Sequence, residues 1–465
     1  NQLSSSGWRE STRMCLAESA LPATLRPRSR GLPWAVGFLV STNFALFWAL
    51  PILLQGQLFH LALKRVLTPL FHWLDSMGAL RRFAAAHIYS KPQYADFFAT
   101  SLLTALNILT AFGALLYLQL THGTISWRAH AMYNLAWVGF GGRMMGAAYT
   151  LAHKEGHNPL IYQRWWRKWI GNVFENWLGV LYGNVPYNFQ TSHNHIHHAL
   201  DAGKGDSFYC WDLDRSSLSD FVLYTERALR HMVGTSSLRY FKLRGMGREY
   251  ALLRRGMVMF WVVTPLLLGL ITRSPWFLFV AWLQPLLAMT TFLALINWGF
   301  HSFIEFDEKG RISPLISALT IVDGEDDTFG EDDHISHHLV PQKWHTQVRS
   351  WREDTHMEDI KKVRGSVFQK VSIPELAALI TLGKFERIAQ KHFVDYSGKL
   401  SQAEIAAMLR RRAQTKEMNH DEYVEWQRRT DAELLASLKK SQQSEELSST
   451  SSPAKARPAL LATNP

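Results

Sequence analysis

The stretch Thr191-Ser-His-Asn-His-Ile-His-His-Ala199 contains four histidines within six residues. Three of them, His193, His197 and His198, follow the pattern H-x-x-x-H-H. If the stretch is helical, residues four apart lie on one face, so His193 and His197 can direct their rings at one metal ion. His198 points about 100° away from His197 and could reach a second metal ion or an open side of the first. We expect His195, which fits no second pattern of this kind, to face solvent or to contact a ligating ring.

Two further histidine clusters flank this stretch in the sequence. His153-Lys-Glu-Gly-His157 precedes it, and His334-Ile-Ser-His337-His338 follows it. We name the three clusters box one (153–157), box two (193–198) and box three (334–338). Neutral imidazole binds iron, zinc, copper and nickel, and one metal ion takes about four to six ligands. Eight imidazoles in three boxes therefore predict two metal ions.

An asparagine and a histidine end the last long apolar run, in the pattern Asn297-x3-His301. We expect His301 to be a ninth ligand, with a hydrogen-bonded histidine at a helix end as the alternative. Asn297 either binds the metal, binds it through water or orients a neighbour. Ligating rings commonly donate their second N–H to a carboxylate. Glu155, Asp332 and Asp333 are the acidic residues that we expect in that role, although an acidic run is often only a solvated face.

The amino-acid composition indicates a lipid-associated protein and excludes some kinds of metal site. The chain has 465 residues, of which 47% are hydrophobic, and a formal net charge of +11. The basic residues are spread along the chain between long apolar runs, so we expect a lipid bilayer with anionic headgroups as the partner, and no nucleic acid. The two cysteines, Cys15 and Cys210, exclude a disulfide framework and a cysteine-based zinc site. Any metal must be held by imidazole, carboxylate or amide.

Long segments without charged residues predict membrane spans. We expect these spans within residues 31–63, 97–127, 131–152, 256–272 and 274–304. The fold class is then an all-α membrane protein, a bundle of about four to six transmembrane helices with a histidine-rich cytosolic helical cap. If both hairpins, 97–152 and 256–304, start from one face, every box emerges at that membrane surface. The opposite turns carry only Arg128 and Arg273, which favours the cytosolic or stromal side for the boxes.

Arg143 lies inside the predicted span 131–152. A charge within a bilayer is costly unless it is paired or hydrated, so we expect Arg143 to face the bundle interior or a water-filled pocket. There it either contacts a substrate headgroup or extends to the nearby interface.

The chain divides into four predicted segments: a basic segment at 1–30, either targeting or disordered; a membrane-embedded domain at 31–345; a soluble helical extension at 346–440; and a disordered tail at 441–465. Within the membrane domain, the tryptophan-rich and basic residues 158–190 predict one amphipathic helix lying in the interface. In the extension, Ser401 and Glu404 predict a capping box at a helix start.

The three boxes, their order, the membrane hairpins and the Asn-x3-His element resemble the membrane-bound fatty acid desaturase and hydroxylase superfamily. The resemblance covers roughly residues 33–345. It implies two iron ions on the cytosolic face, with O2 as co-substrate and removal of hydrogen from an unactivated C–H bond. The ligands that it implies are His153, His157, His193, His197, His198, His301, His334, His337 and His338. Because the sequence has no His-Pro-Gly-Gly haem motif, we expect a separate electron donor, either cytochrome b5 or ferredoxin.

Three functions fit the sequence. The first is an O2-dependent di-iron desaturase that introduces a double bond into a fatty acyl chain. The second is a hydroxylase or monooxygenase of an alkyl lipid, sphingoid base, sterol or carotenoid, since the same ligands serve both outcomes. The third is a metal transporter, which would place histidines within the spans along a pore. We expect the endoplasmic reticulum membrane as the location, with a plastid membrane as the alternative.

Overall fold

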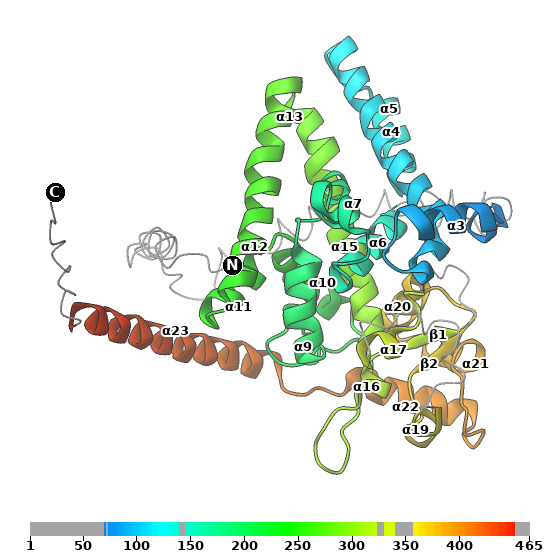
Figure 1. Ribbon diagram of the computed structural model, residues 1–465. Coiled ribbons are helices and arrows are strands. Elements are labelled where there is room, and N and C mark those ends of the chain that lie inside the picture. The colour runs from blue at the N-terminus through cyan, green and yellow to red at the C-terminus, as the bar shows by residue number, and fades with distance from the viewer. Residues whose placement is uncertain (1–68, 71–72, 139–144, 323–329, 340–356, 452–465) are drawn as a thin grey trace, which may run out of the picture. The chain divides into compact units, whose positions relative to one another are not determined.

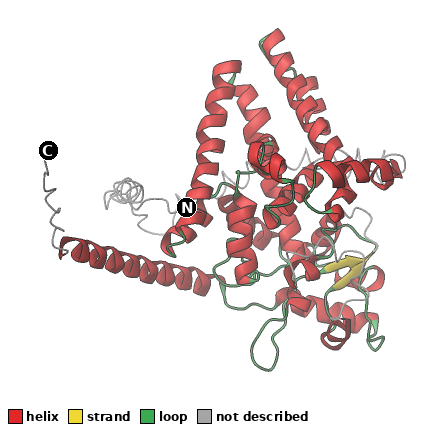
Figure 2. Cartoon of the chain, viewed as in Figure 1, coloured by secondary structure: helices red, strands yellow, loops and turns green. Residues whose placement is uncertain are grey.

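The computed structural model describes residues 69–70, 73–138, 145–322, 330–339 and 357–451. The chain divides into two compact units, Asn1–Phe44 and Ala45–Pro465, and all the described residues belong to the second. The predicted basic segment 1–30, the predicted span 31–63 and Arg143 lie outside the described residues. The described part is mostly helical (Figure 2).

Three helical segments of this part are long and apolar enough to cross a membrane. They are Phe98–His122, Gly247–Thr272 and Pro275–Phe300. These segments match the predicted spans 97–127, 256–272 and 274–304. The first is α4 alone. The other two are composite: α12 (Gly247–Val258), η6 (Met259–Val263) and α13 (Thr264–Thr272), then α14 (Pro275–Leu278), η7 (Phe279–Leu283) and α15 (Gln284–Phe300).

The middle of each composite span is a π-helical turn, η6 or η7, that precedes a proline. Pro265 and Pro285 have no N–H to donate, and their rings would clash with the preceding helical turn, so the backbone widens locally. In Figure 1 the hairpin of α12 to α15 and the hairpin that α4 starts rise from the same side of the molecule. This arrangement brings the ends that carry the histidine boxes to one side.

The predicted span 131–152 is not one continuous described helix. α5 (Trp127–Val138) packs along α4, and α6 (Met145–His157) carries box one, but residues 139–144 between them are not described. The described residues thus contain three of the four to six spans that we expected. Burial separates these three: 67% of the 18-residue apolar stretch within Pro275–Phe300 is buried, whereas the share is 22% for Phe98–His122 and 17% for Gly247–Thr272. α15 is therefore the central helix, and α4 and α13 present apolar faces outward.

The segment 158–190 corrects our prediction of one interfacial helix. It forms α7 (Arg164–Trp169), α8 (Val173–Asn176) and the 3-10 helix η4 (Leu178–Tyr182). Gly171 has φ of 70° between α7 and α8, a left-handed conformation that ends the first helix. Trp165 and Trp169 remain exposed, as residues at a membrane interface would be.

Shorter helices connect the spans and surround the boxes. They are α3 (Gly78–His87), η2 (Pro92–Phe97), η5 (Phe189–His197), α9 (His198–Leu200), α10 (Leu218–Met232), α11 (Thr235–Leu243), α16 (Pro314–Ser317) and α17 (His334–Leu339). α10 packs against α15 on one side, and the C-terminal helices pack on another. Trp298 and Phe300 of α15 belong to these two different cores. Packing on both sides fixes the end of α15, where His301 follows.

A two-stranded parallel sheet departs from the all-α expectation. β1 (Thr320–Val322) pairs with β2 (Val367–Gln369). β1 consists of β-branched residues, and β2 begins with a β-branched and an aromatic residue, which favour strands. The pairing spans the predicted boundary between the membrane domain and the C-terminal extension. The extension contains α19 (Met357–Val363), α20 (Ile373–Thr381), α21 (Phe385–Lys391), α22 (Gln402–Gln414) and α23 (His420–Ser451).

In the C-terminal helices, the predicted capping box is confirmed, and the predicted start of the disordered tail is corrected. The capping box of Ser401 and Glu404 is confirmed at the start of α22, with both reciprocal hydrogen bonds formed. α23 extends to Ser451, through residues 441–451 that we expected to be disordered. That stretch still contains Gln, Glu and Leu, which are good helix formers, so an established helix continues through it.

Candidate metal centre

All nine histidines that the sequence singles out gather into two groups. Group one is His153, His157, His193, His198 and His337. Group two is His197, His301, His334 and His338. Within each group the candidate ligand atoms lie within 4.8 Å of one another. Imidazole nitrogens bound to one ion at about 2.1 Å are separated by roughly 3 to 4 Å, so each group has the dimensions of one metal site.

Box one presents both of its rings from the end of α6. The Nε2 atoms of His153 and His157 are 3.1 Å apart, because residues four apart share a helix face. Gly156 between them allows α6 to approach η5 closely: a Cβ at this position would lie 2.5 Å from the Cβ of Phe189. That approach brings the Nε2 atom of His153 to 2.6 Å from the Nε2 atom of His193 in box two.

Box two lies in a π-helix, and this corrects the predicted pairing of its rings. η5 is π-helical, with the His198 N–H bonded to the His193 carbonyl five residues earlier. His193 is consequently paired with His198, at 2.9 Å between Nε2 atoms, and His197 belongs to the other group. A regular α-helix would have placed His193 and His197 on one face, as we expected. The wider turn divides box two between the two groups.

Box three is also divided between the groups. Its helix, α17, turns His337 toward group one, with Nε2 3.0 Å from that of His198. His334 and His338 belong to group two, where His301 at the end of α15 joins them. The Nε2 atoms of His334 and His301 are 3.1 Å apart.

Four ring Nδ1 atoms are held by oxygen acceptors. His153 contacts Glu331 at 2.8 Å, His197 contacts Asp206 at 2.6 Å, His338 contacts Asp201 at 2.9 Å, and His301 contacts the Ser317 carbonyl at 2.9 Å. An oxygen acceptor at Nδ1 places the proton there and leaves the Nε2 lone pair for a metal. His197 and His338 show this directly, because no polar group in the described part of the chain bonds their buried Nε2 atoms.

The sequence missed these three carboxylates. Glu331 directly precedes the predicted Asp332, so the acidic run did indicate the neighbourhood. Asp201 and Asp206 follow box two in a loop in which Asp201 has φ of 50°, and proximity to box two was the available signal. Asp206 is the most firmly placed, because it is buried and its second oxygen accepts the N–H of Phe208.

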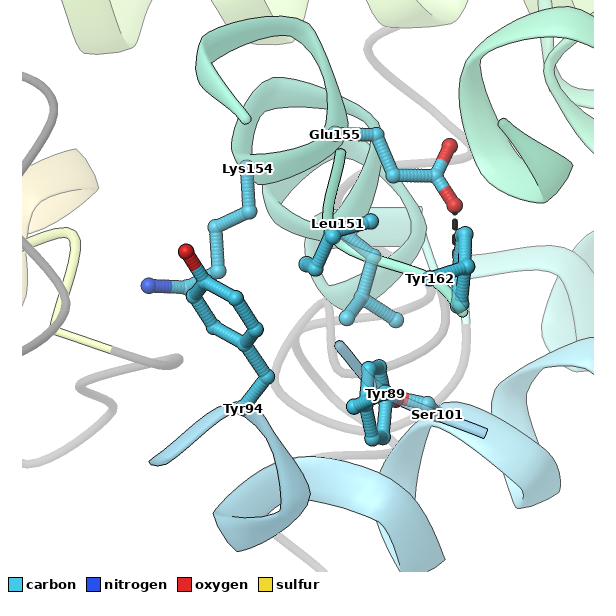
Figure 3. Close-up of a pocket in the computed structure, with 8 residues that line it drawn as sticks. Tyr89, Tyr94, Ser101, Leu151, Lys154, Glu155 and Tyr162 are labelled. Carbon is cyan, nitrogen blue, oxygen red and sulfur yellow. Dashed lines mark hydrogen bonds between the residues drawn. The ribbon is translucent and has the colours of Figure 1, made fainter. Parts of the chain in front are cut away.

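The predicted carboxylates take other positions. Glu155 turns away from the histidines to Tyr162, whose hydroxyl donates to it at 2.5 Å (Figure 3), and it also accepts the N–H groups of Val173 and Glu175. Two residues beyond His153 on a helix is the opposite face. Burial raises the pKa of Glu155 to about 8. Asp332 and Asp333 are both buried beside box three, and the Asp333 carboxylate accepts a hydrogen bond from Thr320.

The two remaining candidates lie near the groups but outside them. The Asn297 amide donates to the Tyr224 hydroxyl at 2.8 Å, and Asn297 lines the same cavity as several of the grouped histidine rings. His195 faces outward with 47% of its side chain exposed, 4.0 Å from Glu249. The solvent-facing alternative for His195 therefore fits its position.

The electrostatics of the groups suit a metal. Burial lowers the pKa of the rings of His157, His193 and His337 well below the usual value of 6.5, and neighbouring histidines lower it further. The rings are therefore neutral at pH 7, which is the state that binds a metal ion. Buried, neutral Nε2 atoms that converge in two groups cannot satisfy each other by hydrogen bonds alone, so these residues fit two imidazole-bound metal ions.

A cavity lies against both groups. His153 and His193 of group one and His197 and His334 of group two contribute to its wall. Its other lining residues are largely apolar and come from α6, α15 and the loop after box two: Tyr149, Phe208, Leu293, Ile296 and Phe300, with Asn297 and Glu331. The cavity is small, about 20 Å³, and its apolar side places hydrocarbon side chains next to both groups.

The sequence pattern of the family described as fatty acid desaturase matches residues 125–370, which is just over half of the chain and includes all nine histidines. The chain belongs to the fatty acid desaturase family. The predicted family is thus confirmed, and with it an oxidoreductase of a typically iron-dependent, membrane-associated kind. Neither the curated proteins nor the solved structures contain a match to this chain.

Proposed function

We propose that this fatty acid desaturase family member is an O2-dependent di-iron desaturase that introduces a double bond into a fatty acyl chain. The observation that carries the proposal is the division of nine histidines into groups of five and four beside one apolar cavity. Group one and group two would each hold one iron. Bound there, the reduced iron pair would supply the activation of O2 that removes hydrogen from an unactivated C–H bond.

The chain's own residues would position the substrate. Leu293, Ile296 and Phe300 lie on one side of α15 and form an apolar wall that ends at His301. Tyr149 of α6 also lines the cavity, with its ring centroid 5.9 Å from that of His153. The cavity, about 20 Å³ as it stands, would widen to admit an acyl chain. A chain held against this wall would keep a small number of carbons near the rings, and such positioning determines which carbon reacts.

The position of the histidines disfavours a metal transporter. All nine lie outside the three described spans, whereas a pore would place ligands within them. We also propose that the boxes face the cytosol or stroma, that a separate cytochrome b5 or ferredoxin supplies electrons, and that the protein resides in the endoplasmic reticulum membrane or a plastid membrane. The basic loops on the side of the boxes support this orientation.

Expression in a host with a defined fatty acid pool tests the proposal. We expect a new unsaturated acyl species in the wild type, with its double bond located by mass spectrometry. The matched control is the double variant His337→Ala/His338→Ala, which removes one ring from each group and should return the pool to that of the host. A hydroxylated product would establish the hydroxylase alternative, and a lipid pool identical in wild type and control would refute both.

A further inference from the structure

A chain of aromatic side chains connects group two with the surface near α23. The Trp211 Nε1–H donates to the carbonyl of His301 at 3.1 Å. Trp211 lies 6.2 Å from Tyr209 between ring centroids, and Tyr209 lies 4.4 Å from Tyr423 on α23. Tyr423 stacks on Trp426 at 5.8 Å. The first three rings are buried, and Trp426 is half-buried on the outer side.

Tyr209 has a feature that packing alone does not require. Its hydroxyl donates to the Glu417 carboxylate at 3.0 Å, and Glu417 is itself held by Lys204 at 3.0 Å and by its own N–H to the Trp211 carbonyl at 2.8 Å. A phenylalanine would fill the same space without this contact. A buried phenol that loses an electron must also lose its proton, and Glu417 is a fixed acceptor at hydrogen-bonding distance.

We propose that Trp211, Tyr209, Tyr423 and Trp426 form a path that carries an oxidising equivalent away from the metal centre when O2 reacts there without a lipid substrate. This inference rests on the proposed function, because it requires an O2-reactive iron centre. Its role would be to protect the nine histidines that would hold the iron ions.

One electron leaves Tyr209 through Trp211 for the oxidised iron centre, the Tyr209 O–H bond breaks, and a new O–H bond forms on Glu417. Tyr209 is then a neutral radical, and the centre has been reduced by one electron. An electron from Trp426, passing through Tyr423, and the proton returning from Glu417 restore Tyr209. A thiol reductant in solution finally reduces Trp426.

The guanidinium of Arg227 lies 4.9 Å from the centre of the Tyr423 ring. A nearby positive charge disfavours a cation radical on Tyr423, so Tyr423 serves as a bridge between its neighbours. Tyr209, whose proton has an acceptor, is where the radical would reside. Burial is the main cause that raises the pKa of Tyr209, and Glu417 raises it further, which keeps the phenol protonated until it is oxidised.

The test uses the iron-loaded full chain with a reductant system and O2 but no lipid substrate. Freeze-quench electron paramagnetic resonance should detect a tyrosyl radical in the wild type, and peptide mass spectrometry should locate oxidation at Trp426. In Tyr209→Phe the radical signal should be lost, and oxidation should shift to Trp211 and the ligand histidines. Tyr182→Phe is the matched control, since Tyr182 is equally buried but donates to backbone carbonyls, and its signal should equal that of the wild type.

Glu417→Gln provides a second variant that keeps all four rings, and it too should lose the signal. A radical that persists in both Tyr209→Phe and Glu417→Gln, at unchanged iron content, would overturn the proposal. So would wild-type protein that shows no radical and oxidises only at its histidines. Addition of a lipid substrate to the same preparation separates the two claims: product without a radical removes only this inference, whereas the absence of both iron and product removes the proposed function.

Discussion

Group one and group two have the same donor atoms but are assembled in different ways. Group one takes rings from all three boxes. Group two takes none from box one and relies instead on His301 and on a loop whose carboxylates, Asp201 and Asp206, hold two of its rings. The difference shows that the spacing of histidines identifies candidate ligands, whereas helix type and loop contacts decide which of them share a group.

The largest expected effect comes from separating the partners within box two. The double variant His193→Ala/His198→Ala removes two rings of group one and should retain the iron of group two. His193→Ala/His197→Ala removes one ring from each group and should weaken both sites. Iron analysis of the purified proteins distinguishes them, with the exposed His195→Ala as a control at wild-type iron content. If His193→Ala/His197→Ala kept the iron of one group while His193→Ala/His198→Ala weakened both, His193 and His197 would share a site, as expected for an α-helix.

The carboxylates that hold the rings should produce the next largest effect. Loss of such a partner typically weakens metal binding by about 10- to 100-fold. Asp206→Asn should therefore weaken group two by roughly that amount, and Asp201→Asn by less, because the Asp201 side chain is 46% exposed. Glu331→Gln should weaken group one instead. Competition with a chelator measures each affinity, and equal effects of all three substitutions on both groups would contradict the assignment.

Overpacking at Gly156, where box one approaches box two, should have a smaller effect. A Cβ in Gly156→Ala would lie 2.5 Å from the Cβ of Phe189, and overpacking of this kind costs about 1–3 kcal/mol. Gly146→Ala on the same helix meets nothing within 4 Å and should stabilise the helix by about 0.5–1 kcal/mol. Thermal unfolding of the two variants should therefore change in opposite directions, and a neutral Gly156→Ala would show that α6 and η5 are less closely packed than described.

Low pH should destabilise the folded protein through His231, which contacts the loop that follows box two. His231 contacts Ser207 at 2.8 Å and the Phe208 ring at 4.2 Å, and burial lowers its pKa to about 4. The folded state therefore binds fewer protons than the unfolded state between pH 6.5 and about 4. The contribution of the neutral His231 ring to the free energy of unfolding is therefore complete above pH 6.5. It decreases by about 1.4 kcal/mol per pH unit as the pH falls from 6.5 to about 4. Unfolding measured at pH 7 and 5.5 should show a smaller acid loss in His231→Gln than in the wild type; an identical loss would contradict it.

The gathering of the nine histidines was predictable because histidines at helical spacing are rare and three such boxes occur together. Their pairing was not, because a π-helical turn in η5 leaves no periodic signature in the sequence. Asp201 and Asp206 escaped notice because they lie in an irregular loop, and Asp201 reaches a ring of box three that only the tertiary fold brings near. Glu155 was assigned by proximity to box one, but its position on α6 directs it to Tyr162.

For the membrane helices, too, the sequence predicts some features and not others. Uncharged runs predicted three described spans, since the bilayer imposes length and composition on each. Composition did not reveal that Gly171 divides residues 158–190 into short helices. It also did not reveal that β2 pairs with β1 across the predicted end of the membrane domain, because strand pairing depends on a partner distant in the sequence.

Iron content per chain tests the central claim most directly. The wild-type protein, purified from iron-supplemented cells and assayed for metals alongside its lipid product, should contain two iron ions per chain and form an unsaturated acyl species. One metal ion per chain, or zinc in place of iron, would contradict the assignment of groups one and two as a di-iron centre.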